Sequence, residues 1–148
     1  MSPLIAALSS RHGMPTVDAG SIDAFLTPAA GEPPHALLFF IGDPAQRGES
    51  NDVAVILPEL LAAFPGRLRA AVVARSAEDA LKPCFHVQVV PSLVLTRGGA
   101  PLGVMPRIRD WSDYLATLRT LLDPAAPEMA APARPQVEFR YTNGRSNA

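Results

Sequence analysis

The fold of this chain is decided by one stretch, Phe85-His86-Val87-Gln88-Val89-Val90-Pro91-Ser92-Leu93-Val94-Leu95-Thr96-Arg97-Gly98-Gly99. Two apolar runs flank a Val-Pro bond, and a Gly-Gly pair follows the second run. Because proline cannot donate a hydrogen bond within a sheet, Pro91 marks the first residue of a strand. Residues 92–96 are typical of a strand, and residues 97–100 supply the turn of a hairpin into a second strand at 102–105.

Outside this stretch, the spacing of apolar residues predicts further strands and helices. Residues 35–41 are a continuous apolar run, and residues 68–74 lack the alternation of a half-exposed strand, which indicates two central strands buried on both faces. Helical spacing predicts a helix over 53–64, capped by a residue within 50–52 and kinked at Pro58, and an amphipathic helix over 111–122 capped by Asp110. Short helices are predicted at 2–10, 22–26 and 77–81, with a brief edge strand at 16–17. The pattern predicts an α/β fold with a mixed sheet of four or five strands.

Composition narrows the class of protein. The chain has 148 residues, 48% hydrophobic and 18% charged, as expected of one globular domain. Its longest apolar run, residues 36–41, is too short to span a membrane, and the N-terminus has no basic signal-peptide region, so we expect a cytoplasmic protein. A single cysteine excludes an internal disulfide, and the scattered His and Cys residues predict no metal site.

Charge is distributed unevenly along the chain. The net charge is −1, yet residues 12–66 carry seven acidic side chains against one arginine, and residues 67–148 carry eleven basic against seven acidic ones. The basic residues are spread out without interleaved aromatic residues, so nucleic-acid binding is not expected. Charge blocks of this kind either steer a charged partner or form an ordinary solvated surface, and the sequence leaves both open.

Three segments follow from these patterns. Residues 1–14 are predicted to be an N-terminal extension, 15–122 the folded domain, and 123–148 a disordered Pro-rich tail. Within the tail only Val137-Glu138-Phe139-Arg140-Tyr141 alternates apolar and charged residues as a strand does, and it either stays free or docks on a sheet edge.

The predicted order of elements resembles the thioredoxin fold. Pro58 matches the proline that kinks the helix after the active site of that family, and the resemblance implies that the Val90–Pro91 bond is cis. Counting back from Pro58, Ser50 and Val53 stand where the two redox cysteines would be. Neither side chain forms a thiolate, so disulfide exchange at this position is excluded.

A closer resemblance is to the hydrogenase-expression accessory proteins of the HyaE/HupG/HoxO type, which lack both cysteines. It rests on the loop Gly42-Asp43-Pro44-Ala45-Gln46-Arg47-Gly48-Glu49-Ser50-Asn51-Asp52, on residues 58–61 and 64–65, and on the stretch that opens this section, ending with Trp111 and its leucine-rich helix. It covers about residues 20–122.

This resemblance implies a non-catalytic assembly chaperone of nickel–iron hydrogenase maturation. Its partner would be the hydrogenase small-subunit precursor, bound through the twin-arginine signal peptide before export. Other hydrogenase accessory proteins are further candidate partners, and no cofactor is implied. Carboxylates bind arginine forks in two-point contacts, and a peptide can pair with an open backbone edge. The candidate partner-binding residues are Asp43, Glu49, Ser50, Asp52, Glu59, Val90 and Pro91.

Two alternatives remain open. In the first, the chain is a thiol redox protein in which Cys84, two residues from His86, reacts with a partner thiol. The position of Cys84 nevertheless favours a structural role as a small, partly buried hydrophobic residue. In the second alternative, the chain is a scaffold module within a larger complex, and the Pro-rich tail is its interaction element.

Overall fold

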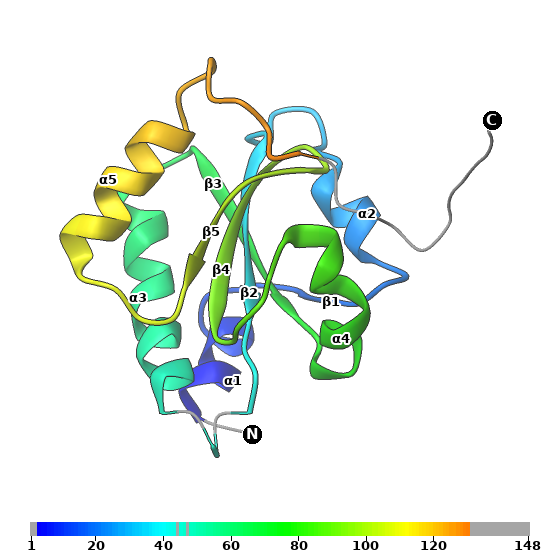
Figure 1. The fold of residues 1–148 in the computed structure, drawn as a ribbon, viewed down its shortest axis with the longest axis vertical. Helices are drawn as coiled ribbons and strands as arrows, with labels where there is room; N and C mark the ends of the chain where they lie inside the picture. The colour runs from blue at the N-terminus through cyan, green and yellow to red at the C-terminus, as the bar shows by residue number, and fades with distance from the viewer. Residues whose placement is uncertain (1–2, 44, 47, 131–148) are drawn as a thin grey trace.

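The computed structural model describes residues 3–43, 45–46 and 48–130 (Figure 1). One sheet holds five strands in the order β1-β3-β2-β4-β5. Their bounds are β1 Thr16–Val17, β2 His35–Phe40, β3 Leu68–Val73, β4 Ser92–Arg97 and β5 Ala100–Pro106. The pairs β1–β3 and β3–β2 are parallel, and the pairs β2–β4 and β4–β5 are antiparallel. The predicted α/β, thioredoxin-like fold with a mixed sheet is confirmed, and β2 and β3 lie inside the sheet as expected.

Helices cover both faces of the sheet. They are α1 Pro3–Ser10, α2 Ile22–Leu26, α3 Glu49–Ala63, α4 Glu78–Leu81 and α5 Trp111–Leu121, with the short 3-10 turns η1 Arg75–Ala77 and η2 Pro83–Phe85. Figure 1 shows α3 and α5 on one side of the sheet, and α2 and α4 on the other. The sheet is therefore the middle of three layers.

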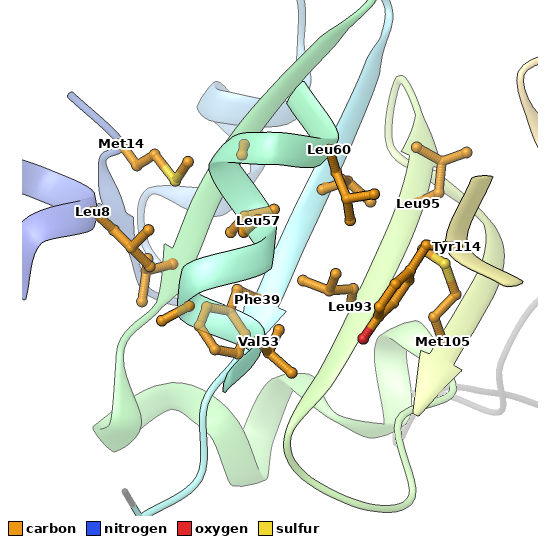
Figure 2. Packing of buried hydrophobic residues seen from close by; sticks show 14 of the residues in the cluster. Leu8, Met14, Phe39, Val53, Leu57, Leu60, Leu93, Leu95, Met105 and Tyr114 are labelled. Carbon is orange, nitrogen blue, oxygen red and sulfur yellow. The ribbon is translucent and has the colours of Figure 1, made fainter. Parts of the chain in front are cut away.

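Burial on both faces explains why β2 reads as an uninterrupted apolar run. All six of its residues are buried, and alternate side chains point to opposite faces. Leu37 and Phe39 belong to the core under α1, α3 and α5, whereas Leu38 and Phe40 belong to the core under α2 and α4. Figure 2 shows the first core, where side chains of α3 and α5 meet those of β4. Burying each large apolar side chain contributes about 1.5–3 kcal/mol.

The helix α3 begins earlier than the sequence predicted. It starts at Glu49 after Gly48, so residues 50–52 lie inside its first turns rather than capping it. Ser50 is fully buried, and its hydroxyl donates a hydrogen bond of 2.6 Å to the carbonyl oxygen of Ile41. The Ser50 hydroxyl is therefore not available to cap the helix. It bonds instead to the Ile41 carbonyl, directly after β2, because a buried carbonyl needs a hydrogen-bond donor.

The segment before Pro91 also differs from the expected apolar strand. Phe85 ends η2, and His86 has a left-handed backbone with φ of 61°. Val87 is buried beyond this bend, and its amide donates to the carbonyl of Lys82. The predicted cis Val90–Pro91 bond is confirmed, and Pro91 directly precedes β4.

Both ends of the described chain pack on this sheet. Ile5 and Leu8 of α1 are buried in the α3 core, although residues 1–14 were predicted to be an extension. Ala126, within the segment predicted to be a disordered tail, is buried as well. Residues 131–148 lie outside the described residues, so the prediction of a tail stays a prediction for them. Pro58 lies within α3 as expected.

Candidate partner-binding site

Strand register brings most of the predicted partner-binding residues to one end of the sheet. Phe40 pairs with Ser92 in β4, and Ser92 pairs with Pro106 at the end of β5. Four segments therefore lie at the same end of the sheet, where β2 and β5 finish and β4 begins. They are the loop after β2, the first turn of α3, the Val90–Pro91 segment and the loop after β5, and we call this end of the sheet the edge. Three parts of the chain that are distant in sequence thus meet here: residues 41–52, the Val90–Pro91 segment and the loop after Pro106.

The loop after β2 is held by a buried carboxylate. Gly42 has φ of 73°, a conformation that glycine adopts at little cost, and its amide donates a hydrogen bond of 3.0 Å to Oε2 of Glu78. Glu78 is buried at the start of α4. Asp43, partly exposed, accepts a hydrogen bond from the Ala45 amide at 3.0 Å and lies 3.7 Å from the Arg75 guanidinium. Asp43 is thus held in a turn, beside a positive charge.

Glu49 connects the first turn of α3 to the loop after β5 at this edge. Its carboxylate binds the Arg107 guanidinium and accepts a hydrogen bond of 3.1 Å from the Ile108 amide. The hydrogen bond and the charge of Glu49 raise the pKa of Arg107. Arg107 has φ of 62°, and its own amide donates to the carbonyl of Pro91 at 2.7 Å. Glu49 is therefore connected to the Pro91 segment through one residue.

Tyr114 fixes the loop after β5 from beneath. Its ring is fully buried, and its hydroxyl donates to the Arg107 carbonyl and accepts from the Arg109 amide, both at 3.2 Å. Burial raises the pKa of this hydroxyl, so it stays protonated and able to donate. The backbone on both sides of Arg107 is thereby positioned by α5.

Val90 leaves backbone groups open at this edge. No hydrogen bond of the described residues uses its N–H or C=O, whereas the Val89 carbonyl accepts a hydrogen bond of 2.7 Å from the Ser92 hydroxyl. Pro91 is buried, Val90 is half-buried and the Val89 side chain is 45% exposed. We call the N–H and C=O of Val90, with the Val89 side chain beside them, the Val90 site.

The remaining predicted residues separate into three cases. Ser50 is fully buried against the Ile41 carbonyl, so its hydroxyl is a structural donor and the predicted partner contact is corrected. Asp52 is exposed on the first turn of α3. Glu59 is exposed as well, but it lies ten residues beyond Glu49 along the helix, about 15 Å at the usual rise. Glu59 is therefore remote from the Val90 site.

An apolar cavity lies at the carboxyl ends of the parallel strands. Its volume is about 280 Å³, and most of its lining is aliphatic: Ile5, Ala6, Ser9, Thr16, Ile41, Val72, Val73, Ala74 and Arg75. Arg75, which faces Asp43, joins this cavity to the loop after β2. An apolar side chain of a partner fits such a cavity, with charged groups at its rim.

Sequence reasoning missed Arg107 and Glu78. Arg107 follows β5 and is 58 residues from Glu49, and no local pattern pairs residues so far apart. Glu78 starts a four-residue helix, where its carboxylate resembles any acidic residue of a first turn. Its contact with Gly42, 36 residues away, becomes visible only in the folded chain.

The described residues hold no group of three or more His, Cys, Asp or Glu side chains placed to bind a metal ion. Nor does this part of the chain contain a helix long and apolar enough to cross a membrane. Cys84 is partly buried, and its thiol lies 3.8 Å from the Ala80 carbonyl. Nε2 of His86 contacts the carbonyl of Ala130 at 2.8 Å.

Comparisons with known proteins point to one family. The family model of Hydrogenase-1 expression protein HyaE matches residues 4–114. Hydrogenase expression/formation protein HupG of Rhizobium leguminosarum bv. viciae is 54% identical over 140 residues, covering 95% of this chain and 94% of that protein. Hydrogenase expression/formation protein HoxO of Azotobacter vinelandii is 40% identical over 120 residues, covering 81% of this chain and 78% of that protein.

A solved structure agrees with these sequences. The crystal structure of hydrogenase expression/formation protein hupG from Rhodopseudomonas palustris CGA009 has a TM-score of 0.52 and 44% identity, and it covers 73% of this chain and 94% of that one. Residues 4–114, which the family model matches, contain all five strands of the sheet and the edge described above. The chain belongs to the HyaE family of hydrogenase expression proteins.

Proposed function

We propose that this protein is a non-catalytic assembly chaperone of hydrogenase maturation that binds the small-subunit precursor through its twin-arginine signal peptide. The names of its relatives support a role in hydrogenase expression and formation. Binding before export places the protein in the cytoplasm, where the precursor is made. Other accessory proteins of the same process are further partners in this proposal.

The observation that carries the proposal is the Val90 site. Backbone N–H and C=O groups form hydrogen bonds whenever partners are available, and those of Val90 have none among the described residues. An extended peptide that lies alongside Val90 supplies both partners, as when a strand is added to a sheet. A signal peptide is synthesised without a folded domain of its own, so it can adopt this extended form.

Carboxylates at the same end of the sheet as the Val90 site suit a pair of arginines. Asp52 is exposed on the first turn of α3, and Asp43 is partly exposed beside Arg75. A guanidinium binds a carboxylate through two parallel hydrogen bonds, a geometry that lysine cannot reproduce. Glu49 already binds Arg107, so its role in the proposal is to position the loop after β5.

The apolar part of a signal peptide needs an apolar surface, and the 280 Å³ cavity beside Arg75 supports this step. It opens at the same sheet edge as the loop after β2, because Ile41 lines it and Gly42 follows. Open backbone groups, carboxylates and an aliphatic cavity thus lie at the same end of the sheet, where a peptide can contact them.

A binding role without catalysis is supported by the residues at the thioredoxin positions. Val53 and Ser50 are both fully buried, and neither can act as a thiolate nucleophile. Cys84 lies beyond α4, in η2, rather than at the α3 N-terminus.

Calorimetric titration of the full chain with the synthetic small-subunit signal peptide tests the proposal. Asp52→Asn is expected to weaken binding by about two- to fivefold and to reduce its dependence on salt, as removal of a charge at the rim of an interface does. A peptide with two lysines in place of the arginines is expected to bind more weakly and to respond less to Asp52→Asn.

Glu59→Gln is the matched control, because it removes the same charge from an exposed position on the same helix. It is expected to leave the affinity unchanged. Equal weakening by both variants would reduce the electrostatic effect to non-specific attraction. Failure of the wild-type chain to bind the peptide at all would overturn the proposal.

A further inference from the structure

One side of the strand β3 is only partly covered by its neighbour. β2 pairs with the whole length of β3, whereas β1, on the other side, pairs only with Val72 and Val73. The Val72 amide donates to the Pro15 carbonyl at 2.9 Å, so the backbone groups of Val72 point away from β2. Because successive residues of a strand point their backbone groups to alternate sides, those of Leu68 and Ala70 point the same way. Both therefore face a side of β3 that β1 does not reach.

The chain before β1 turns away from this side of β3 instead of continuing along it. Gly13 has φ of 66°, a left-handed conformation that glycine adopts at little cost, and the Met14 amide donates to the Leu8 carbonyl of α1 at 3.0 Å. The loop before β1 is thus connected to α1. No hydrogen bond among the described residues uses the N–H or C=O of Ala70 on this side. Unpaired backbone groups on the outside of a strand are where a further strand adds to a sheet.

A cavity of about 500 Å³ lies beside these backbone groups. Arg69 and Ala70 of β3 line it, together with Phe25 of α2, Leu61 of α3 and residues 12–15 of the loop before β1. Since α2 and α3 lie on opposite faces of the sheet, the cavity has one wall from each face (Figure 1). A strand added beside β3 would point alternate side chains toward these two walls.

The wall on the α2 face has a fixed positive charge. The Arg69 guanidinium lies over the Phe25 ring, 4.6 Å from its centre, and donates to the carbonyls of Phe25 at 2.6 Å and Pro33 at 3.1 Å. Glu32 lies 3.9 Å away, too far for a hydrogen bond, and its carboxylate accepts from the Ala29 amide at 2.8 Å. Nη2 of Arg69 is buried and has no hydrogen-bond partner among the described residues, which is unfavourable. A carboxylate is the partner that this guanidinium lacks.

We propose that this open side of β3 is a second binding site, which takes an extended segment of a partner protein with an acidic residue between two apolar residues. The backbone of the segment pairs with Leu68 and Ala70, its carboxylate binds Arg69, and its apolar side chains pack toward Leu61. Alternation places the acidic side chain on one face of the sheet and its two neighbours on the other, as the two walls require.

This second site is separate from the Val90 site. It lies near the start of β3, whereas the Val90 site lies where β2 ends, and the two share no residue. The second site therefore goes beyond the proposed function and does not depend on it. The two sites also select segments of opposite charge, since Arg69 lines one and Asp52 lies at the same end of the sheet as the other.

NMR titration of the full chain with the peptide acetyl-Thr-Val-Glu-Val-Thr-amide tests the backbone pairing. We expect the Ala70 amide to exchange rapidly in the free chain, because it has no acceptor, and roughly tenfold more slowly when nine-tenths of the sites are occupied. The Ala71 amide, which points toward β2, is the internal control and should not change. A peptide with its three central amides N-methylated cannot donate to β3 and should leave Ala70 unprotected.

The charge preference is tested with the same peptide carrying glutamine in place of glutamate. It is expected to bind the wild-type chain roughly fivefold more weakly, and Arg69→Gln is expected to remove this difference between the two peptides. Arg11→Gln, at an exposed position next to the loop that lines the cavity, is the matched control and should preserve the difference. Comparing two peptides on one variant separates a change in binding from a change in stability, because Arg69 also binds two carbonyls of the fold.

Several results would overturn the proposal. Slow exchange of Ala70 in the free chain would show that the open side is already filled, by this chain or by a second copy of it. Absence of binding, or binding that leaves Ala70 unprotected, would exclude the pairing with β3. Equal affinity of the glutamate and glutamine peptides for the wild-type chain would exclude the contact with Arg69, and equal loss of the preference in Arg69→Gln and Arg11→Gln would reduce it to non-specific attraction.

Discussion

The carboxylate of Glu49, in the first turn of α3, binds the guanidinium of Arg107 directly after β5. The same carboxylate accepts the Ile108 amide at 3.1 Å, and the Arg107 amide donates to the Pro91 carbonyl at 2.7 Å. One side chain thus connects three segments at the proposed binding edge. A carboxylate that looks available for a partner in the sequence is in fact a structural connection within the chain.

Glu49→Ala is expected to loosen the loop after β5. It removes the acceptor of the Ile108 amide and leaves Arg107, whose φ is positive, without its ion pair. We expect a lower melting temperature and amide shift changes at Ile108 and Ser92, measured by thermal unfolding and two-dimensional NMR. Glu59→Ala on the exposed surface of the same helix is the control. Unchanged Ile108 and Ser92 signals would contradict the connection.

Ser50→Ala is expected to destabilise the fold, although alanine favours helices. The change leaves the buried Ile41 carbonyl without its 2.6 Å donor, which costs about 1–3 kcal/mol. The free energy of unfolding in urea measures this loss. Ser112→Ala, at an exposed position in the first turn of α5, gains the same helix propensity without removing the donor of a buried carbonyl, so it should be neutral or slightly stabilising. Equal stability of the two variants would refute a structural role for Ser50.

The sheet and its flanking helices were predictable because their signals are local. β2 lies between two layers, so its residues after His35 are all apolar in sequence, and the proline before β4 identified the start of that strand. The start of α3 was predicted wrongly because serine is common at helix caps. Here the Ile41 carbonyl, nine residues earlier, binds the Ser50 hydroxyl and places it within the helix.

The proposed binding edge was only partly predictable, because its contacts join distant residues. Asp52 and Val90 were proposed from the loop composition and from the position of Pro91, and as partner-binding residues they stay predictions. The pairing of Glu49 with Arg107 depends on the register of β4 and β5, which the sequence does not display. The packing of residues 122–130 was missed for a related reason: arginine side chains bind backbone carbonyls there, and a backbone carbonyl has no sequence signature.

Disulfide reductase activity is expected to be absent. The chain has one cysteine, and reduction of a disulfide by a dithiol cycle needs two. Insulin reduction by dithiothreitol should proceed at the background rate when this protein is added, whereas thioredoxin, as a positive control, accelerates it. Acceleration that disappears in Cys84→Ser would revive a redox role for that residue.

His35 is expected to make stability depend on pH. It is buried at the start of β2, and burial, Arg97 of β4 and Arg67 before β3 lower its pKa below the ordinary value of 6.5. Glu128 faces the same Arg97 at 4.0 Å, and no hydrogen-bond partner of His35 Nε2 is present among the described residues. The folded chain therefore keeps this ring neutral at a pH where the unfolded chain protonates it.

The contribution of His35 to the free energy of unfolding should accordingly be constant above about pH 6.5. Below that pH it should fall, until the ring is protonated in the folded chain as well. Urea unfolding at pH 7.5, 6.0 and 5.0 measures the slope, and His35→Leu should reduce it while removing a buried nitrogen that lacks a partner. His12→Gln, at an exposed position, is the control and should keep the wild-type slope. An unchanged slope in His35→Leu would show that other groups, and not the ring between the two arginines, set the response of this fold to acid.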